Sequence, residues 1–175
     1  MTKNTFSPIG AIVQARTTSS RLPKKIFKDL DGFPVIEQIV LKLKSVDLID
    51  TVVIATTDDP ADNVLIEWCK VKNLNYFVGD KENVLSRFYH CANKYQFKSI
   101  VRITSDNPLI DIEIIEKTIN LFLQGYDYVA NNIIKSFPHG LDVEVFSFNS
   151  LERSFNEAFE KSHTEHVTQY IRHNE

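Results

Sequence analysis

The side chains best suited to chemistry lie in one polar stretch, residues 14–26, which directly follows the apolar run 9–13. This stretch contains no acidic residue. Its basic side chains are Arg16, Arg21, Lys24 and Lys25, and its hydroxyl side chains are Thr17, Thr18, Ser19 and Ser20. Guanidinium, ammonium and hydroxyl groups all donate hydrogen bonds, so the set suits a polyanion, most simply a triphosphate.

The polar stretch lies where open α/β sheets bind ligands, at the carboxyl end of a first strand. The loop over 15–33 is longer than most strand-to-helix connections, which is typical of a functional loop. No GxGxxG follows the strand, and no GxxxxGK[ST] occurs in the chain, so a conventional dinucleotide site or P-loop is not expected. We therefore expect phosphate groups to be held by Ala15, Arg16, Ser19, Ser20 and Arg21, together with Lys24 or Lys25.

A second polar turn follows the strand predicted over 99–104 and contains Asp106. This residue falls just past the carboxyl end of a predicted strand, at the same edge of the sheet as the basic loop. One carboxylate facing a triphosphate suits Mg²⁺, which takes its remaining ligands from phosphate oxygens and water. The alternative is that Asp106-Asn107-Pro108 only forms a turn. Asp111 is expected to cap the helix that follows.

Other polar side chains occur in or near predicted strands. Thr56 and Asp58 would border a nucleobase or ribose beside the first loop, with a simple turn as the alternative for Asp58. Asp142 and Glu144 are two residues apart, so they share one face of a predicted strand. They would contact a polar acceptor or help to hold the metal, and the alternative is a solvated strand face.

Apolar runs that alternate with helical segments must position these groups. Strands are predicted over 9–14, 51–56, 75–78, 99–104, 126–130 and 142–148. Strand–helix alternation with short connections predicts an α/β fold, a mostly parallel sheet with helices on both faces. The 175 residues fit one domain, 1–175. His163 and His166 have a spacing that would permit a metal, but a surface helix is favoured.

Composition excludes several partners. The net charge of −3 argues against a general nucleic-acid binder, because such proteins carry a broad basic surface. The polar start of the chain does not resemble a signal peptide, and no apolar run approaches the length of a membrane span. We therefore expect a cytoplasmic protein without nucleic-acid or membrane partners.

On these residues the chain resembles the cytidylyltransferases that activate acidic sugars as CMP-sugars. Within that family it is most similar to the spore-coat polysaccharide biosynthesis type, with acylneuraminate and 3-deoxy-manno-octulosonate cytidylyltransferases as relatives. The family pattern Q-A-R-x-x-S-x-R-L-P-x-K matches residues 14–25, which places Lys25 rather than Lys24 at the family's lysine. Thr18 and Lys24 stand where glycines are common. Further matching segments are 55–58, 83–89, 102–111, 137–146 and 165–168.

The resemblance implies a Rossmann-like nucleotide-diphospho-sugar transferase fold, CTP and a sugar acceptor as partners, and Mg²⁺ as cofactor. Arg16, Arg21 and Lys25 would hold the β- and γ-phosphates, and Asp106 would place Mg²⁺ near the α-phosphate. A sugar hydroxyl would attack the α-phosphorus and give a CMP-sugar and pyrophosphate. The resemblance thus implies Arg16, Lys25 and Asp106 as catalytic residues, and it adds Arg87 and Arg102, which lie in matching segments, to the substrate site.

One departure from the family concerns the end of the chain. Family members usually continue to a D-x-P-E-D segment that is thought to supply a second metal carboxylate, whereas this sequence ends at Glu175. Three explanations remain open. The sequence is a fragment, or Asp142 or Glu144 supplies the second metal carboxylate instead, or the protein is a catalytically impaired nucleotide-binding module. The identity of the sugar also stays open, and so does the oligomeric state, for which the family implies a possible homodimer.

Overall fold

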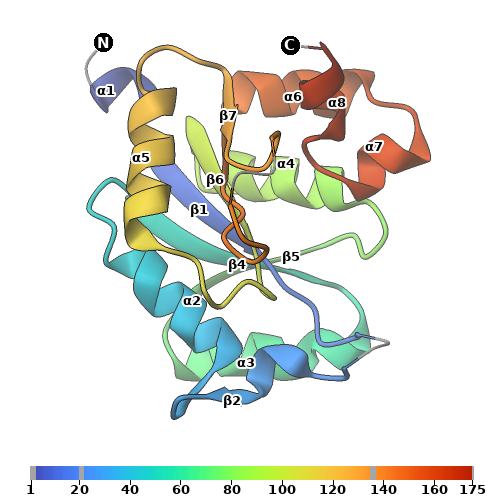
Figure 1. The fold of residues 1–175 in the computed structure, drawn as a ribbon. Helices are drawn as coiled ribbons and strands as arrows, with labels where there is room; N and C mark the ends of the chain where they lie inside the picture. Colours follow the sequence, from blue (N-terminus) through green and yellow to red (C-terminus); the bar gives the residue numbers. More distant parts are fainter. Residues whose placement is uncertain (1–2, 20–21, 135–136, 175) are drawn as a thin grey trace.

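A computed structural model of the chain describes residues 3–19, 22–134 and 137–174. A six-stranded sheet runs through its centre in the order β5-β4-β1-β6-β8-β7 (Figure 1). The strands are β1 Ile9–Gln14, β4 Thr51–Thr57, β5 Asn75–Gly79, β6 Ser99–Thr104, β7 Tyr128–Ala130 and β8 Glu144–Ser147. A separate short hairpin consists of β2 Asp29–Leu30 and β3 Phe33–Pro34.

The sheet is parallel over four of its strands. β1 pairs in parallel with both β4 and β6, and β4 pairs in parallel with β5. β8 pairs antiparallel with both β6 and β7. The predicted strand over 142–148 begins later than expected, at Glu144, so Asp142 precedes the strand and does not share a strand face with it. The carboxyl ends of β1, β4, β5 and β6 meet at one edge, and this edge carries the polar loops.

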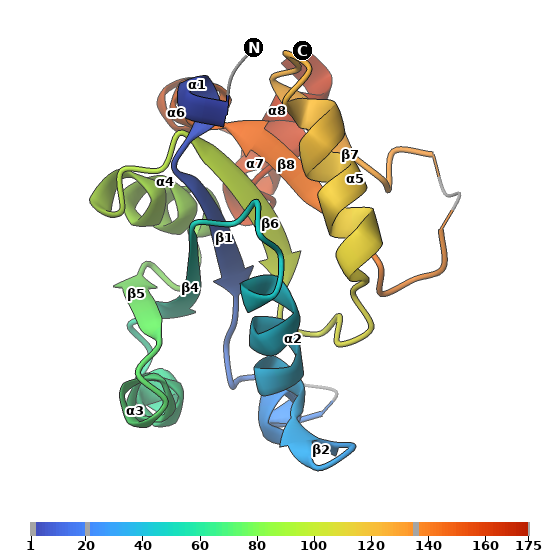
Figure 2. The same cartoon turned by 90° about the vertical axis from the view of Figure 1, so that its left-hand side faces the viewer.

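Helices cover both faces of the sheet. Figure 2 shows α2 and α5 on one side of β1 and β6, with α4 on the other. The helices are α1 Lys3–Phe6, α2 Val35–Lys44, α3 Asn63–Val71, α4 Val84–Lys94, α5 Ile112–Phe122, α6 Phe148–Glu157, α7 Lys161–Glu165 and α8 Gln169–Asn174. Two 3₁₀ turns, η1 Lys25–Phe27 and η2 Pro60–Asp62, follow β1 and β4. The predicted α/β architecture is therefore confirmed.

Two apolar clusters flank the sheet, and β1 contributes to both. Ala11 and Val13 pack with α2, α3 and α5, whereas Ile12 packs with α4, α6 and α8. Successive side chains of a strand point to opposite faces, so a strand buried on both sides must be apolar throughout. Within the described part of the chain, no helix has both the length and the apolar character that crossing a membrane requires.

Candidate functional site

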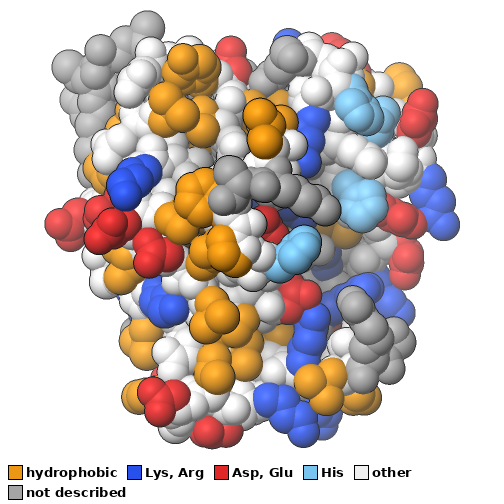
Figure 3. Space-filling model, viewed as in Figure 1, with side chains coloured by type: hydrophobic (Ala, Val, Ile, Leu, Met, Phe, Trp, Pro, Cys, Tyr) orange, Lys and Arg blue, Asp and Glu red, His pale blue; other side chains and the backbone are white. Residues whose placement is uncertain are grey.

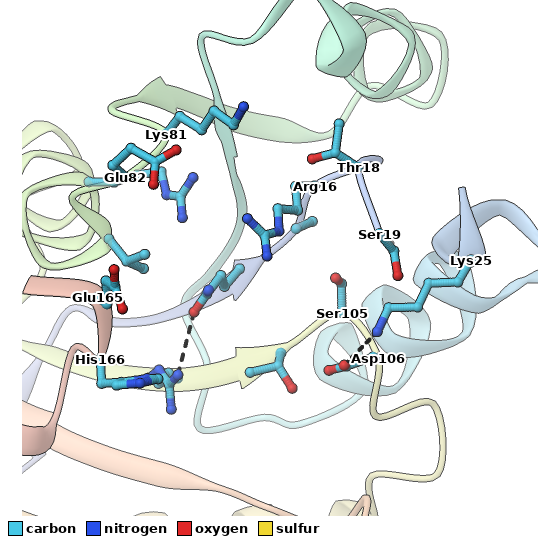
Figure 4. A pocket seen from close by; sticks show the side chains of 16 residues that line it. Arg16, Thr18, Ser19, Lys25, Lys81, Glu82, Ser105, Asp106, Glu165 and His166 are labelled. Atoms are coloured by element: carbon cyan, nitrogen blue, oxygen red, sulfur yellow. Dashed lines mark hydrogen bonds and ion pairs between the residues drawn. The ribbon is translucent and has the colours of Figure 1, made fainter. Parts of the chain in front are cut away.

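A pocket of about 510 Å³ opens where β1 and β6 end (Figure 4). This volume lies within the range of small-molecule sites, roughly 300–1,000 Å³. Its walls come from the loop after β1, the turn after β6, the start of α4 and the end of α7. The predicted site residues that line it are Ala15, Arg16, Ser19, Lys25, Arg87, Arg102 and Asp106. Ser20 and Arg21 lie outside the described residues.

A second pocket of about 510 Å³ differs in chemistry. It lies between α5 and the segment that follows β7, and its lining includes Leu121, Val129 and Phe137. Figure 3 shows hydrophobic side chains gathered over this side of the molecule, whereas basic, acidic and histidine side chains gather toward α7. The polar pocket is therefore the candidate site for a charged ligand.

An ion pair joins the basic loop to the turn after β6. Lys25 Nζ donates to Asp106 Oδ2 at 2.6 Å, and both side chains remain partly exposed, at 29% and 46%. Partial burial of Asp106 opposes its ionisation, but hydrogen bonds from Lys25 and Thr104, with the charge of Lys25, outweigh it and lower the pKa of Asp106. Asp106 therefore carries a negative charge near neutral pH.

A lysine of α2 holds the turn that carries Asp106. Lys42 Nζ donates to the carbonyl oxygens of Pro108 and Ile110, each at 3.0 Å. At the end of the same segment, Asp111 caps α5 by accepting from the Ile114 N–H at 3.0 Å, as predicted. The Asp106 turn is thus an anchored turn at the pocket.

Lys24 and Lys25 play different parts in the loop. Lys25 begins η1 and lines the pocket, whereas Lys24 precedes it and adopts φ 53°, in the left-handed region. That region favours glycine, which explains why glycine suits this position. The placement agrees with the assignment of Lys25, rather than Lys24, to the pocket.

Arg87 of α4 is the most unusual charge in the pocket. Its residue is only 2% exposed, and its Nε and Nη1 atoms find no hydrogen-bond partner among the described residues. Burial, followed by the charge of nearby Arg16, lowers the pKa of Arg87. A buried cation with unpartnered donors is costly, so this arrangement suits a site that receives an anion.

Arg87 reaches this place because Gly79, at the end of β5, has no side chain. A Cβ added at Gly79 would lie 3.0 Å from Arg87 Cγ and 2.9 Å from a ring carbon of Phe77. Figure 4 shows the Arg16 side chain directed into the pocket, which Arg87 also lines. Two guanidinium groups from different elements thus approach one cavity.

Glu144 lies behind the pocket and holds Arg102. The Glu144 residue is 2% exposed and forms ion pairs with Arg102 and Arg172, while Thr168 Oγ1 donates to its carboxylate. Burial opposes ionisation of Glu144, but the two arginines outweigh it and lower its pKa. The solvated-face alternative is wrong for Glu144, because folding closes β6 and α8 over it. Asp142 and Glu144 do not line the pocket.

Two other predicted residues also lie away from the pocket. Thr56 is fully buried in β4, and its Oγ1 has no partner within the described residues. Asp58 is exposed just after β4, and its backbone N–H donates to the Gly79 carbonyl at 3.1 Å. Neither side chain lines the cavity.

Sequence reasoning missed the wall opposite the basic loop. Glu82, Glu165 and His166 line it, together with Lys81 (Figure 4). The spacing of His163 and His166 predicts only a surface helix, and no local pattern marks Glu82. The end of α7 faces the pocket because Thr168 and the following α8 dock onto Glu144, a contact between segments 24 residues apart.

Comparison with known proteins identifies the family of this chain. The family model described as cytidylyltransferase matches residues 10–175. An uncharacterized protein of Methanocaldococcus jannaschii is 40% identical over 164 residues, covering 93% of this chain and 66% of its own length. The spore coat polysaccharide biosynthesis protein SpsF of Bacillus subtilis is 35% identical over 167 residues, covering 92% and 68%. This chain therefore spans about two thirds of these relatives.

More distant relatives include a 3-deoxy-manno-octulosonate cytidylyltransferase of Pelobacter propionicus, 26% identical over 142 residues, with 73% of this chain and 55% of that protein covered. Among solved structures, a cytidylyltransferase of Leptospira borgpetersenii superposes with a TM-score of 0.89 at 29% identity, covering 95% of this chain and 71% of that one. A CMP:2-keto-3-deoxy-manno-octonic acid synthetase complexed with CTP gives a TM-score of 0.75 at 16% identity, with 96% and 86% covered.

Proposed function

Because this chain belongs to the cytidylyltransferase family, we propose that it transfers the cytidylyl group of CTP to a sugar acceptor and releases pyrophosphate. The acceptor we propose is an acidic sugar, and the product a CMP-sugar for surface polysaccharide or glycan biosynthesis. Support for this finer statement comes from the names of the relatives, a spore coat polysaccharide biosynthesis protein and 3-deoxy-manno-octulosonate cytidylyltransferases.

The observation that carries the proposal is the buried guanidinium of Arg87, whose Nε and Nη1 have no hydrogen-bond partner among the described residues. Arg87 lines the pocket together with Arg16 and Lys25. A ligand that satisfies all three cations must carry several negative charges close together, as a triphosphate does. The hydroxyl groups of Ser19 and Ser105 add neutral donors on the same side.

These residues act by positioning and by neutralising charge. Arg16 and Lys25 would bind the outer phosphates and stabilise the negative charge that develops on the leaving pyrophosphate. Lys25 donates to Asp106, and a phosphate oxygen would replace this partner when the nucleotide binds. The acceptor hydroxyl would then lie in line with the α-phosphorus and the leaving oxygen.

Asp106 is the residue we propose for Mg²⁺. It is an ionised, half-exposed carboxylate beside the phosphate-binding groups. In the described ranges, no cluster of three or more His, Cys, Asp or Glu side chains is arranged to hold a metal. This donor set fits Mg²⁺, which is commonly bound through one or two carboxylates together with phosphates and water. When bound, Mg²⁺ would neutralise charge on the phosphates.

Two measurements on the purified chain test the proposal. Calorimetry with CTP and MgCl₂ should show saturable binding that is stronger than binding of ATP or GTP. Pyrophosphate release should then appear with an acidic sugar such as N-acetylneuraminate or 3-deoxy-manno-octulosonate, and not with neutral hexoses. Absence of CTP binding would contradict the proposal, whereas binding without release for any sugar would favour the nucleotide-binding module.

A further inference from the structure

A second buried acid, Asp62, lies behind the loop that we assign to the phosphates. The residue is 0% exposed and ends the 3₁₀ turn η2 after β4. Its Oδ1 accepts hydrogen bonds from the Thr17 backbone N–H at 2.6 Å and from Thr17 Oγ1 at 2.7 Å. Its Oδ2 accepts from Thr57 Oγ1. Both oxygens of the carboxylate are thus engaged by donors from β4 and from the loop.

Thr17 is the residue at which the loop closes. Its carbonyl oxygen accepts from the Lys24 backbone N–H at 3.0 Å, so Thr17 and Lys24 lie side by side in the loop. The Thr17 hydroxyl also lies 2.8 Å from the Ala61 carbonyl oxygen, a second acceptor on η2. The backbone N–H, the carbonyl and the side chain of Thr17 are therefore all engaged.

Residues that line the pocket lie next to Thr17 and next to Lys24 in the chain. Arg16 and Thr18 flank Thr17 directly and line the pocket, and Lys25 follows Lys24. Beyond Lys25, Ile26 is buried in the apolar core and anchors the far end of the loop. Thus Asp62 anchors the loop where it leaves β1, and Ile26 anchors it where it returns.

The nature of the donors explains why an acid is used here. A buried carboxylate loses hydration, and this loss is tolerated only when both oxygens receive hydrogen bonds of good geometry. Both hydrogen bonds from Thr17 end on one oxygen of Asp62, so this side chain holds the backbone N–H and the hydroxyl of Thr17 in one place. Burying the Asp62 side chain is therefore unfavourable by itself, but the hydrogen bonds that it accepts fix the position of the loop.

We propose that Asp62 is a positioning residue, whose buried carboxylate fixes Thr17 so that Arg16 and Lys25 meet the outer phosphates of CTP. The inference rests on the proposed function and deepens it. Asp62 itself touches no substrate in this scheme, since it does not line the pocket. Ligand-binding side chains generally depend on such supporting hydrogen bonds for their geometry.

The test uses Asp62→Ala and a matched control at the other end of β1. Asp50 Oδ2 accepts from the Ile9 backbone N–H at 2.7 Å, so Asp50→Ala removes the same kind of bond far from the pocket. Both variants should lower the thermal unfolding midpoint. Only Asp62→Ala should weaken binding of CTP with MgCl₂, by about 10- to 100-fold in calorimetry, as loss of a supporting hydrogen bond does at other sites.

A comparison of nucleotides separates positioning from general damage. CMP lacks the β- and γ-phosphates, so Asp62→Ala should weaken CTP binding much more than CMP binding measured by competition. Asp62→Asn keeps an oxygen for the Thr17 N–H and an amide that can donate to Thr57, so it should restore most of the CTP affinity. Should Asp62→Ala fail to fold, Thr17→Val, which keeps only the backbone bond, should reduce CTP affinity by about 3- to 10-fold.

Equal CTP affinity in wild type and Asp62→Ala would overturn the inference, and so would equal losses for CTP and CMP. In the event that Asp62→Ala does not fold, wild-type affinity in Thr17→Val would overturn it. A wild-type chain that binds no CTP would instead contradict the proposed function, so the two failures are distinguishable.

Discussion

The two walls of the pocket are built in different ways. The loop wall, residues 15, 16, 18, 19 and 25 with the Asp106 turn, presents cations and hydroxyls from one short stretch of sequence beside that turn. The helix wall, formed by α4 and α7, presents Arg87 beside Glu165 and His166. A buried acid stands behind each wall. Asp62 supports the loop wall through one amide and two hydroxyl groups, whereas Glu144 supports the helix wall and the pocket floor through two arginines.

This difference teaches where each acid acts. Asp62 fixes the Thr17 backbone N–H and hydroxyl from behind the loop. Glu144 joins β6 to α8 and thereby holds Arg102 while fixing the end of α7. Changes to the partly exposed side chains that the loop wall presents should therefore alter turnover with little effect on stability, and changes to the buried acids behind the walls should lower stability as well. The predictions below test this division.

The largest effect on turnover is expected for Asp106→Asn on the loop wall. The change keeps the size of the side chain and removes the charge proposed for Mg²⁺, so pyrophosphate release should fall about 1,000-fold or more. The unfolding midpoint should stay close to that of the wild type, because Asp106 is partly exposed. Wild-type turnover in this variant would show that Asp106 has no metal role.

A smaller loss is expected for Lys25→Ala. Removing one preorganised cation from developing phosphate charge should lower turnover about 100-fold. The unfolding midpoint should again change little, because the Lys25–Asp106 pair is partly exposed and such pairs contribute little to stability. Lys24→Ala is the matched control, since Lys24 does not line the pocket, and it should keep near-normal turnover. Equal losses in both variants would contradict the assignment of Lys25.

Glu144→Gln should show the opposite balance. Turnover should fall only about tenfold, through Arg102 and α7. Stability should fall by about 3 kcal/mol, because Arg102 and Arg172, both partly exposed, lose the counter-charge of the buried Glu144 carboxylate. Thermal unfolding followed by circular dichroism at neutral pH measures this loss of stability. A Glu144→Gln variant as stable as the wild type would exclude the role given to Glu144.

The same pair of proteins tests the pH dependence. The folded pKa of Glu144 lies below its unfolded value, so its stabilisation is present above the unfolded pKa of about 4.3. It is lost as pH falls through the lower, folded pKa. The difference in unfolding midpoint between wild type and Glu144→Gln should therefore shrink as the solution is acidified below about pH 4. A difference that is independent of pH would contradict the ion-pair account.

Much of the fold could be predicted because the buried parallel strands are mainly apolar. The predicted bounds of β1 and β6 coincide with the structure, since both strands are buried between two layers of helices. The predicted bounds of the later strands were less accurate. Tyr126 and Asp127 precede β7 and Asp142 precedes β8, because these short strands lie on the outer side of the sheet, where the apolar pattern is weaker. The residues of β8 do not indicate that it runs antiparallel to β6.

For the site, sequence reasoning succeeded where the chemistry is contiguous. Arg16 and Lys25 belong to one short stretch, and both line the pocket. The support for the walls joins distant residues, since Thr17 and Asp62 are 45 positions apart and Arg102 and Glu144 are 42 apart. Asp62 follows Asp58 and Asp59 in an acidic stretch, and only folding separates the buried Asp62 from the exposed Asp58 and the partly exposed Asp59.

The most direct test of the central claim, that the pocket is built for a polyanion, is Arg87→Met. Methionine keeps much of the unbranched apolar stem and removes a buried charge with unpartnered donors. In the free protein, the unfolding midpoint should stay the same or rise. In calorimetry with MgCl₂, the same variant should bind CTP at least about tenfold more weakly. A lower unfolding midpoint together with wild-type CTP affinity would contradict the account, because Arg87 would then serve the fold and not the ligand.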